Sequence, residues 1–136
     1  MRIYFAGSIR GGRDDWAVYK DIIRLLSEFG DVLTEHIGNS ELSVTGEDLL
    51  DRDIHDRDLQ WLASCDVLVA EVTRPSLGVG YEIAKASDWD KPILCIYRPS
   101  VTPRLSAMIG GCKSVKLKSY ERPDELRAFF NEVLKN

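Results

Sequence analysis

The sequence predicts an α/β fold, a single doubly wound (Rossmann-like or flavodoxin-like) parallel sheet of five strands with helices on both faces. Short apolar runs, at residues 67–71 and 92–97, are typical of strands buried on both faces. Segments of helical period alternate with such runs through short connections, which favours parallel strand–helix–strand units. A chain of 136 residues has room for one core, so we expect one domain over residues 1–136.

The first half of the chain is expected to supply two strands and two helices. Residues 2–6 and 32–36 are predicted strands. A helix is predicted over residues 14–29, because apolar side chains recur there at helical spacing and Gly30 follows as a stop. Residues 51–63 are predicted to form the second helix, which leads into the next strand.

The second half continues the alternation. The apolar run 67–71 is the predicted central strand, followed by a helix over residues 81–89 and a fourth strand over 92–97. Three shorter elements complete the chain, namely a short helix at 105–109, an edge strand at 114–117, and a helix that Pro123 opens and that ends near residue 135. Right-handed crossovers then place the loops after strands one, three and four at one edge of the sheet.

Composition argues against several classes of function. A net charge of −4 gives no basic face for polymeric nucleic acid. No apolar run reaches the roughly 18 residues of a membrane helix and no signal peptide is recognised, so we expect no membrane association and a cytoplasmic protein. Cys65, Cys95 and Cys112 lack metal-ligand spacing, as do His36 and His55. Cys65 and Cys95 are therefore expected to be buried free thiols.

The loop after the central strand, residues 73–80, is the first candidate for a ligand site. Open α/β sheets bind ligands between the carboxyl end of a strand and the amino end of the next helix. Small residues there leave backbone N–H groups uncovered, and the helix terminus adds partial positive charge, which favours an anion. Glu82 is expected in the first helical turn, where the dipole keeps a carboxylate ionised. Ordinary turn chemistry and dipole compensation explain this stretch equally well by themselves.

The predicted sheet edge brings further polar residues to this loop. The glycine-rich segment after the first strand contributes Ser8 and Arg10, and the loop after the third strand contributes Ser76 and Gly78. The Arg10 guanidinium has the planar fork that binds phosphate through two N–H groups. Together with Glu82, these residues predict a catalytic site for a phosphorylated substrate.

Three common α/β motifs do not fit. Residues 78–80 begin like a dinucleotide fingerprint, but Ile83 stands at its sixth position and the loop follows a third strand. Residues 7–12 have P-loop spacing, yet Arg13 and Asp14 stand where Lys and a hydroxyl residue are needed, which argues against NTP hydrolysis. A phospho-receiver needs an acidic pair after the first strand, and the sequence has none there.

Carboxylates are the remaining candidates for catalysis. Asp58 lies seven residues after Asp51, near the turn that leads to the central strand, although an exposed surface acid explains it equally well on spacing alone. Asp51, Asp53 and Asp56 are expected on a solvated helix face. Tyr4 stands inside the first strand, where a core position is the ordinary explanation.

Five blocks of the sequence resemble the 2′-deoxynucleoside 5′-monophosphate N-hydrolases of the wider nucleoside 2-deoxyribosyltransferase superfamily. The blocks keep the family's order and extend from the first strand to about Gly110. They are YFAGSIRGGR at 4–13, LTEH at 33–36, DLQWL at 58–62, the segment from Asp66 to Glu82, and LSAMI at 105–109. The resemblance implies that the whole chain is one nucleoside 2-deoxyribosyltransferase-like domain.

The resemblance also implies a role for each candidate residue. Glu82 corresponds to the nucleophile that attacks the anomeric carbon and forms a covalent glycosyl intermediate. Asp58 corresponds to the acid that helps the base leave, and Tyr4 to the tyrosine that orients the nucleophile. A 5′-phosphate site is implied at Ser8, Ile9, Arg10, Gly11, Ser76 and Gly78. Ser106 and Met108 correspond to residues that reach the neighbouring subunit's pocket, and His36 falls in a block near the sugar or base.

The expected function is hydrolysis of the N-glycosidic bond of a (2′-deoxy)nucleoside 5′-monophosphate by a homodimer with shared active sites. Free base and sugar 5-phosphate would be released without a metal or other cofactor. One alternative is a nucleoside 2-deoxyribosyltransferase that exchanges bases, but it has no use for the phosphate site formed by Ser8, Arg10 and Ser76. Another alternative is a module that binds a nucleotide without turning it over.

Overall fold

The computed structural model describes residues 1–8, 15–34 and 49–135. Within them, five strands form one sheet in the order β2-β1-β3-β4-β5, and every neighbouring pair is parallel. This is the strand order of flavodoxin-like doubly wound folds, so the expected fold class is confirmed. The strands are β1 (Arg2–Ala6), β2 (Asp31–Val32), β3 (Val67–Glu71), β4 (Ile93–Tyr97) and β5 (Val115–Ser119).

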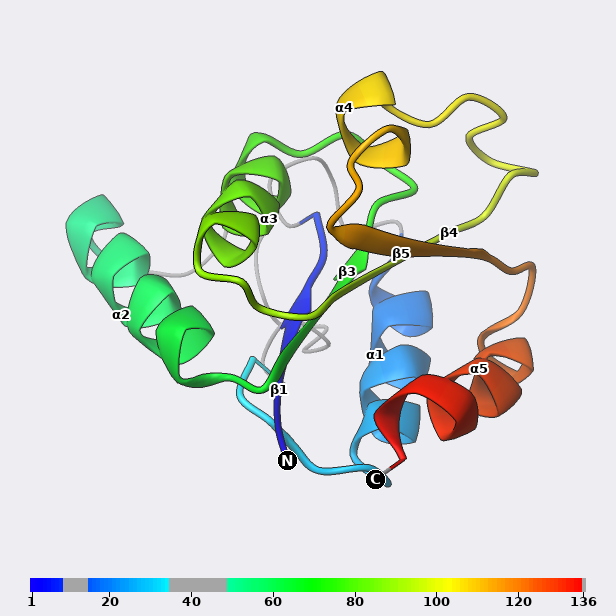
Figure 1. The fold of residues 1–136 in the computed structure, drawn as a ribbon, viewed down its shortest axis with the longest axis horizontal. Helices are drawn as coiled ribbons and strands as arrows, with labels where there is room; N and C mark the ends of the chain where they lie inside the picture. Colours follow the sequence, from blue (N-terminus) through cyan, green and yellow to red (C-terminus); the bar gives the residue numbers. More distant parts are fainter. Residues whose placement is uncertain (9–14, 35–48, 136) are drawn as a thin grey trace.

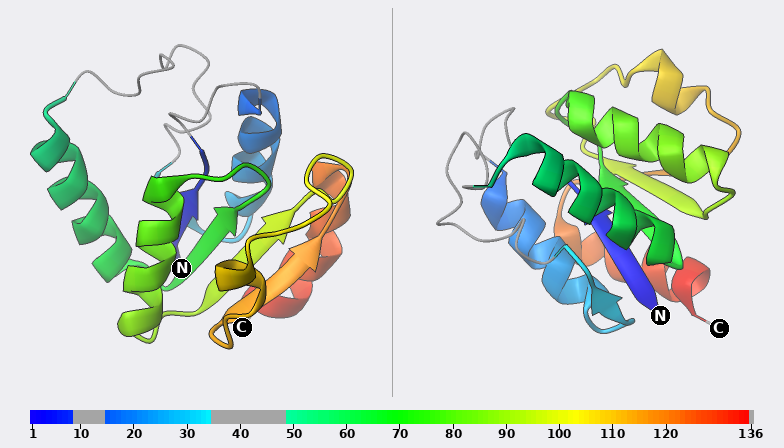
Figure 2. Two further views of the ribbon diagram at one scale, coloured as in Figure 1. Left: turned by 90° about the horizontal axis from the view of Figure 1, so that it is seen from above. Right: turned by 90° about the vertical axis from the view of Figure 1, so that its left-hand side faces the viewer.

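Helices lie on both faces of the sheet, as Figures 1 and 2 show. They are α1 (Trp16–Leu26), α2 (Asp51–Ser64), α3 (Leu77–Asp88), α4 (Ala107–Gly110) and α5 (Leu126–Leu134), with a 3₁₀ turn, η2 (Pro123–Glu125), directly before α5. α1 and α5 pack on one face, whereas α2 and α3 pack on the other. None of the helices in these three ranges is long and apolar enough to cross a membrane.

β3 forms the centre of the molecule because both of its faces are covered. Val67 and Val69 belong to the core under α1 and α5, whereas Leu68 and Ala70 belong to the core under α2 and α3. All the residues of this strand are buried. Burial on both sides explains the continuous apolar run, which a half-exposed strand would not need.

The carboxyl ends of β1, β3 and β4 meet at one edge of the sheet. Ala6 pairs with Ala70, and Ala70 pairs with Cys95. The residues just beyond these positions are therefore neighbours, although the sequence separates them by tens of residues. This confirms the expectation that the loops after strands one, three and four share an edge, and that edge carries the candidate site.

The second strand is shorter than expected and ends at Val32. Beyond Val32, the side chain of Thr34 takes the place of backbone pairing with β1. Its Oγ1 accepts a hydrogen bond from the Phe5 N–H at 2.9 Å and donates one to the Phe5 carbonyl at 2.5 Å. The hydroxyl satisfies the edge of β1 and lets the backbone leave the sheet early. The rest of the predicted strand, 35–36, lies outside the described residues.

Gly30 has a different role from the expected helix stop. α1 ends earlier, at Leu26, and the Ser27 hydroxyl donates to the Ile23 carbonyl at 2.8 Å. A Cβ atom at Gly30 would lie 2.2 Å from the Met1 carbonyl oxygen. The glycine is thus required by the close approach of two backbone segments at the start of β1.

The third helix begins four residues earlier than the sequence predicts, at Leu77. Ser76 is its N-cap, with extended backbone angles and an Oγ that accepts the Val79 N–H at 3.3 Å. Gly78 and Gly80 have low helix propensity, but the cap and the packing of the helix override that preference.

Candidate active site

Tyr4 and Glu82 form the centre of the candidate site. Tyr4 lies in β1 on the face covered by α2 and α3, and its side chain is fully buried. Its hydroxyl donates a hydrogen bond to Oε2 of Glu82, which comes from α3. Tyr4 therefore lies in the core, as expected, and also contacts the carboxylate.

Burial, rather than the helix dipole, governs the ionisation of Glu82. The residue is in the second turn of α3, since the helix begins at Leu77, so the expected first-turn position is wrong. Burial raises the pKa of Glu82 to about 7, the hydrogen bond from Tyr4 lowers it, and the negative charge of Asp58 raises it further. Near neutral pH this carboxyl group is thus close to half ionised.

Tyr4 stays protonated throughout the physiological range. Burial and the neighbouring charges of Glu82 and Asp58 raise the pKa of its phenol well above the ordinary value. The hydroxyl is therefore a permanent donor toward Glu82, and it stabilises the ionised form of that carboxylate.

Asp58 supplies a second carboxylate from α2. Its side chain is 24% exposed, and Oδ1 contacts the Arg57 guanidinium at 2.9 Å. Asp51, Asp53 and Asp56, on the same helix, are exposed, which confirms that they form a solvated face. Asp58 and Glu82 are close enough for each charge to matter to the other, yet one is half-buried beside a cation and the other is desolvated.

The amino end of α3 has features that favour an anion. Among the residues described, the N–H groups of Leu77 and Gly78 have no hydrogen-bond partner. A Cβ at Gly78 would meet only the Ser76 Oγ, at 3.9 Å, and one at Gly80 would meet nothing within 4 Å. Free donors, open space and the positive helix end are the features that favour binding of a phosphate group.

Ser8 follows β1 at the same edge of the sheet. Its N–H donates to the Tyr19 hydroxyl at 3.1 Å, while its side chain is 1% exposed. The Ser8 Oγ has no hydrogen-bond partner within the described part of the chain. A buried hydroxyl without a partner is unfavourable unless a ligand completes it, which fits the role that the resemblance implies.

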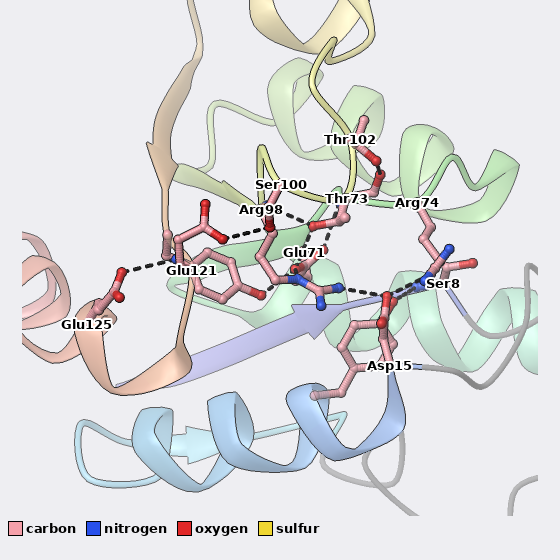
Figure 3. A network of polar contacts seen from close by, with 12 residues as sticks. Ser8, Asp15, Glu71, Thr73, Arg74, Arg98, Ser100, Thr102, Glu121 and Glu125 are labelled. Carbon is pink, nitrogen blue, oxygen red and sulfur yellow. Dashed lines mark hydrogen bonds and ion pairs between the residues drawn. The ribbon is translucent and has the colours of Figure 1, made fainter.

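A buried network of charged residues, which sequence reasoning missed, lies behind this edge (Figure 3). Arg98, directly after β4, lies with Nη2 2.8 Å from Asp15 Oδ2 and with Nε 3.4 Å from Glu71 Oε2. Both contacts are ion pairs without aligned hydrogen-bond geometry. Glu71 also accepts hydrogen bonds from the N–H and hydroxyl of Thr73, each at 2.8 Å, and from the Tyr120 hydroxyl.

The remaining predicted residues divide into two groups. Ser106 is the N-cap of α4, where its Oγ accepts the Met108 N–H at 3.3 Å, and Met108 is 83% exposed. Neither contacts Tyr4 or Glu82 within the chain. Four others lie outside the described residues, namely Ile9, Arg10, Gly11 and His36. No group of three His, Cys, Asp or Glu side chains suited to a metal occurs in the described ranges.

The family model described as nucleoside 2-deoxyribosyltransferase matches residues 3–115. The chain belongs to this family. It is 58% identical, over 113 residues, to the 5-hydroxymethyl-dUMP N-hydrolase of Tetraodon nigroviridis, with 82% of this chain and 80% of the relative covered. It is 49% identical to the 5-hydroxymethyl-dUMP N-hydrolase of Danio rerio over the full length of both proteins.

A solved structure extends the likeness in fold. A CMP N-glycosidase of Clostridium botulinum superposes with a TM-score of 0.70 at 18% sequence identity, over 98% of this chain and 100% of that one. The nucleoside 2-deoxyribosyltransferase family thus accounts for the fold, and the hydrogen-bonded pair of Tyr4 and Glu82 lies within the matched residues.

Proposed function

We propose that the protein hydrolyses the N-glycosidic bond of (2′-deoxy)nucleoside 5′-monophosphates to free base and (2-deoxy)ribose 5-phosphate. The observation that carries the proposal is that α3 combines N–H donors at its amino end, which have no partner among the described residues, with a half-buried carboxylate, Glu82, held by Tyr4. The amino end of α3 would thereby bind the phosphate, and Glu82 in its second turn would contact the sugar. The names of the Tetraodon nigroviridis and Danio rerio relatives support this class of substrate.

Glu82 is the proposed nucleophile. Cleavage of an N-glycosidic bond gives the sugar oxocarbenium character, so a nearby carboxylate stabilises the transition state and forms a bond to the anomeric carbon as the base leaves. Water then attacks the same carbon, releases Glu82, and supplies the oxygen of the sugar hydroxyl. Tyr4 holds the carboxylate in place through its hydrogen bond.

Asp58 is the proposed acid that assists the departing base. The base leaves with a pair of electrons and needs a proton or a hydrogen bond. Two carboxylates in different environments suit this division of roles, since Glu82 is desolvated and Asp58 is half-buried beside Arg57. His36 is proposed to lie near the sugar or base.

The 5′-phosphate is proposed to occupy the edge formed by the β1 and β3 loops. Ser76 and Gly78 belong to the amino end of α3, where N–H donors have no partner in the part of the chain that the structure describes, and the same holds for the hydroxyl of Ser8. Ile9, Arg10 and Gly11 complete the site in this proposal. Binding energy from the remote phosphate positions the anomeric carbon against Glu82.

We further propose a homodimer in which Ser106 and Met108 reach the neighbour's pocket. Support comes from three apolar side chains on α3 and α4 that are open to solvent. Leu77 is 97% exposed, Met108 83% and Tyr81 45%. Large apolar side chains open to solvent are typical of a protein interface, and a second copy would cover them.

The cytoplasm is the proposed location. Cys65 and Cys95 are buried free thiols, as expected, and burial raises the pKa of both, to about 12 for Cys95. Such thiols are typical of proteins kept in a reducing compartment.

To test this function, the pure protein is incubated with each nucleoside monophosphate and, separately, with the matching nucleoside. The release of free base is measured by chromatography. We expect base to appear from monophosphates with wild type and not with Glu82→Ala. Base exchange with an added second base would favour the transferase. Saturable binding with unchanged ligand after long incubation would contradict catalysis and leave a binding module.

A further inference from the structure

Arg74 is a further charged residue at the edge of the sheet that carries the candidate site. It lies in the loop between β3 and α3, two residues before the N-cap Ser76. Its Nε donates to Asp15 Oδ2 at 2.9 Å, and its side chain is 36% exposed, against 6% for Asp15. The Nη groups of Arg74 have no partner among the residues that the structure describes.

Asp15 holds this guanidinium in a fixed orientation. The carboxylate is buried at the start of α1, and its Oδ2 also lies 2.8 Å from Nη2 of Arg98, which Glu71 anchors in turn. Because Asp15 occupies only Nε of Arg74, the far edge of the guanidinium keeps its donors for another acceptor. Figure 3 shows Arg74 and Ser8 at the same end of the network, with Asp15 beneath them.

The position of Arg74 matches the proposed phosphate site. The pairing of Ala6 with Ala70 brings the residues after β1 beside those after β3, so Ser8 and Arg74 follow adjacent strands. Within the described ranges, the buried Ser8 Oγ lacks a partner, and the N–H groups of Leu77 and Gly78 at the amino end of α3 are free. A hydroxyl, a helix terminus and an oriented guanidinium are three kinds of donor that bind phosphate groups in proteins.

We propose that Arg74, oriented by Asp15, binds the 5′-phosphate of the substrate directly. The inference rests on the proposed function, because it assigns a ligand within that site. A guanidinium clamped at Nε presents two parallel N–H groups, which match two phosphate oxygens. Lysine supplies the positive charge but not the two parallel N–H groups. Arg74→Lys is therefore expected to retain part of the affinity for phosphate, and Arg74→Gln to lose more.

The test measures kcat and KM for a nucleoside monophosphate and, separately, the affinity for inorganic phosphate by calorimetry. Arg74→Gln is expected to raise KM and weaken phosphate binding by about tenfold or more, with a much smaller change in kcat, and Arg74→Lys to fall between. Arg24→Gln is the matched control, because Arg24 on α1 is 70% exposed and makes only a long contact with Asp21, at 3.7 Å. Thermal unfolding of each variant is recorded beside the kinetics.

The outcomes separate this inference from the proposed function. Equal KM and phosphate affinity in Arg74→Gln and Arg24→Gln would overturn the role of Arg74 while the hydrolase stands. Wild type that binds phosphate through Arg74 but releases no base would overturn the hydrolase and keep the anion site. A fall in kcat and unfolding temperature with unchanged phosphate affinity would assign Arg74 a structural role and overturn the inference.

Discussion

Glu82 is a carboxylate whose chemistry is set by desolvation and one phenol. Because burial raises its pKa to about 7, its ionised fraction changes across the neutral range. A protonated carboxyl group cannot attack the anomeric carbon, so kcat/KM is expected to fall about tenfold per pH unit well below pH 7. A pH–rate profile measures this limb. A rate that stays constant down to pH 5 would contradict the assignment of Glu82.

Tyr4→Phe tests the hydrogen bond directly. Tyr4 donates to the carboxylate and lowers the pKa of Glu82, so its loss is expected to move the acidic limb of kcat/KM to higher pH. Activity at pH 7 falls accordingly and recovers in part at higher pH. Tyr97→Phe is the control, since the hydrogen bond described for Tyr97 uses its backbone carbonyl. An unshifted limb in Tyr4→Phe would refute the coupling.

The raised pKa of Glu82 also predicts how stability varies with pH. The pKa is 4.5 when unfolded and about 7 when folded, so the folded state binds more protons between these values and stability falls as pH rises through them. Glu82→Gln avoids this cost and still accepts from Tyr4. The free energy of unfolding is expected to rise in this variant by at most about 3 kcal/mol at pH 8 and by close to zero at pH 4. Urea denaturation at both pH values measures it, and an equal effect at each would contradict the account.

At the scale of elements, the buried pairs of Arg98 tie the end of β4 to α1 and β3. Arg98→Met leaves the carboxylates of Asp15 and Glu71 without this cation. It is expected to lower the free energy of unfolding by about 3 kcal/mol or more. Arg127→Gln removes an exposed partner of Glu28 at 2.8 Å and is expected to have little effect on unfolding. Similar urea midpoints for the two variants would show that the network does not hold these elements.

The boundaries of an element were predictable where the spacing of apolar residues decides them. They were not predictable where a single side-chain hydrogen bond decides them. β3 is predictable because both faces are buried, which leaves an apolar run in the sequence. β2 ends early because the Thr34 hydroxyl takes over the hydrogen bonds of Phe5, and α3 starts early because Ser76 caps it. A single polar contact of this kind leaves no periodic signal.

At the scale of the whole molecule, the proposed dimer predicts a link between assembly and activity. Met108→Glu places a charge on a side chain that is 83% exposed in one chain, and is expected to shift a dimer to monomer and to lower kcat/KM at the same protein concentration. Val101→Glu, at an apolar residue 42% exposed in the loop after β4, is the control. Sedimentation velocity measures the shift. A wild type that is monomeric at micromolar concentration and fully active would exclude the shared site.

The site itself was only partly predictable. Glu82, Ser8 and Ser76 could be placed together because parallel strands bring their carboxyl ends to one edge. The network of Asp15, Glu71, Arg98 and Tyr120 could not, because it joins residues at or just beyond the ends of four elements, and each of them alone resembles an ordinary surface charge or core tyrosine. The desolvation of Glu82 was also missed, since burial depends on the packing of α2 and α3 against β1.

Intact-protein mass spectrometry of a single turnover tests whether Glu82 forms a covalent bond to the sugar. The protein is mixed with a nucleoside monophosphate, quenched in acid within the first turnover, and digested to locate any adduct. We expect a mass increase of one sugar-phosphate unit on the peptide that contains Glu82, appearing together with free base and absent in Glu82→Gln. Free base released at the wild-type rate by Glu82→Gln, with no adduct on either protein, would contradict it.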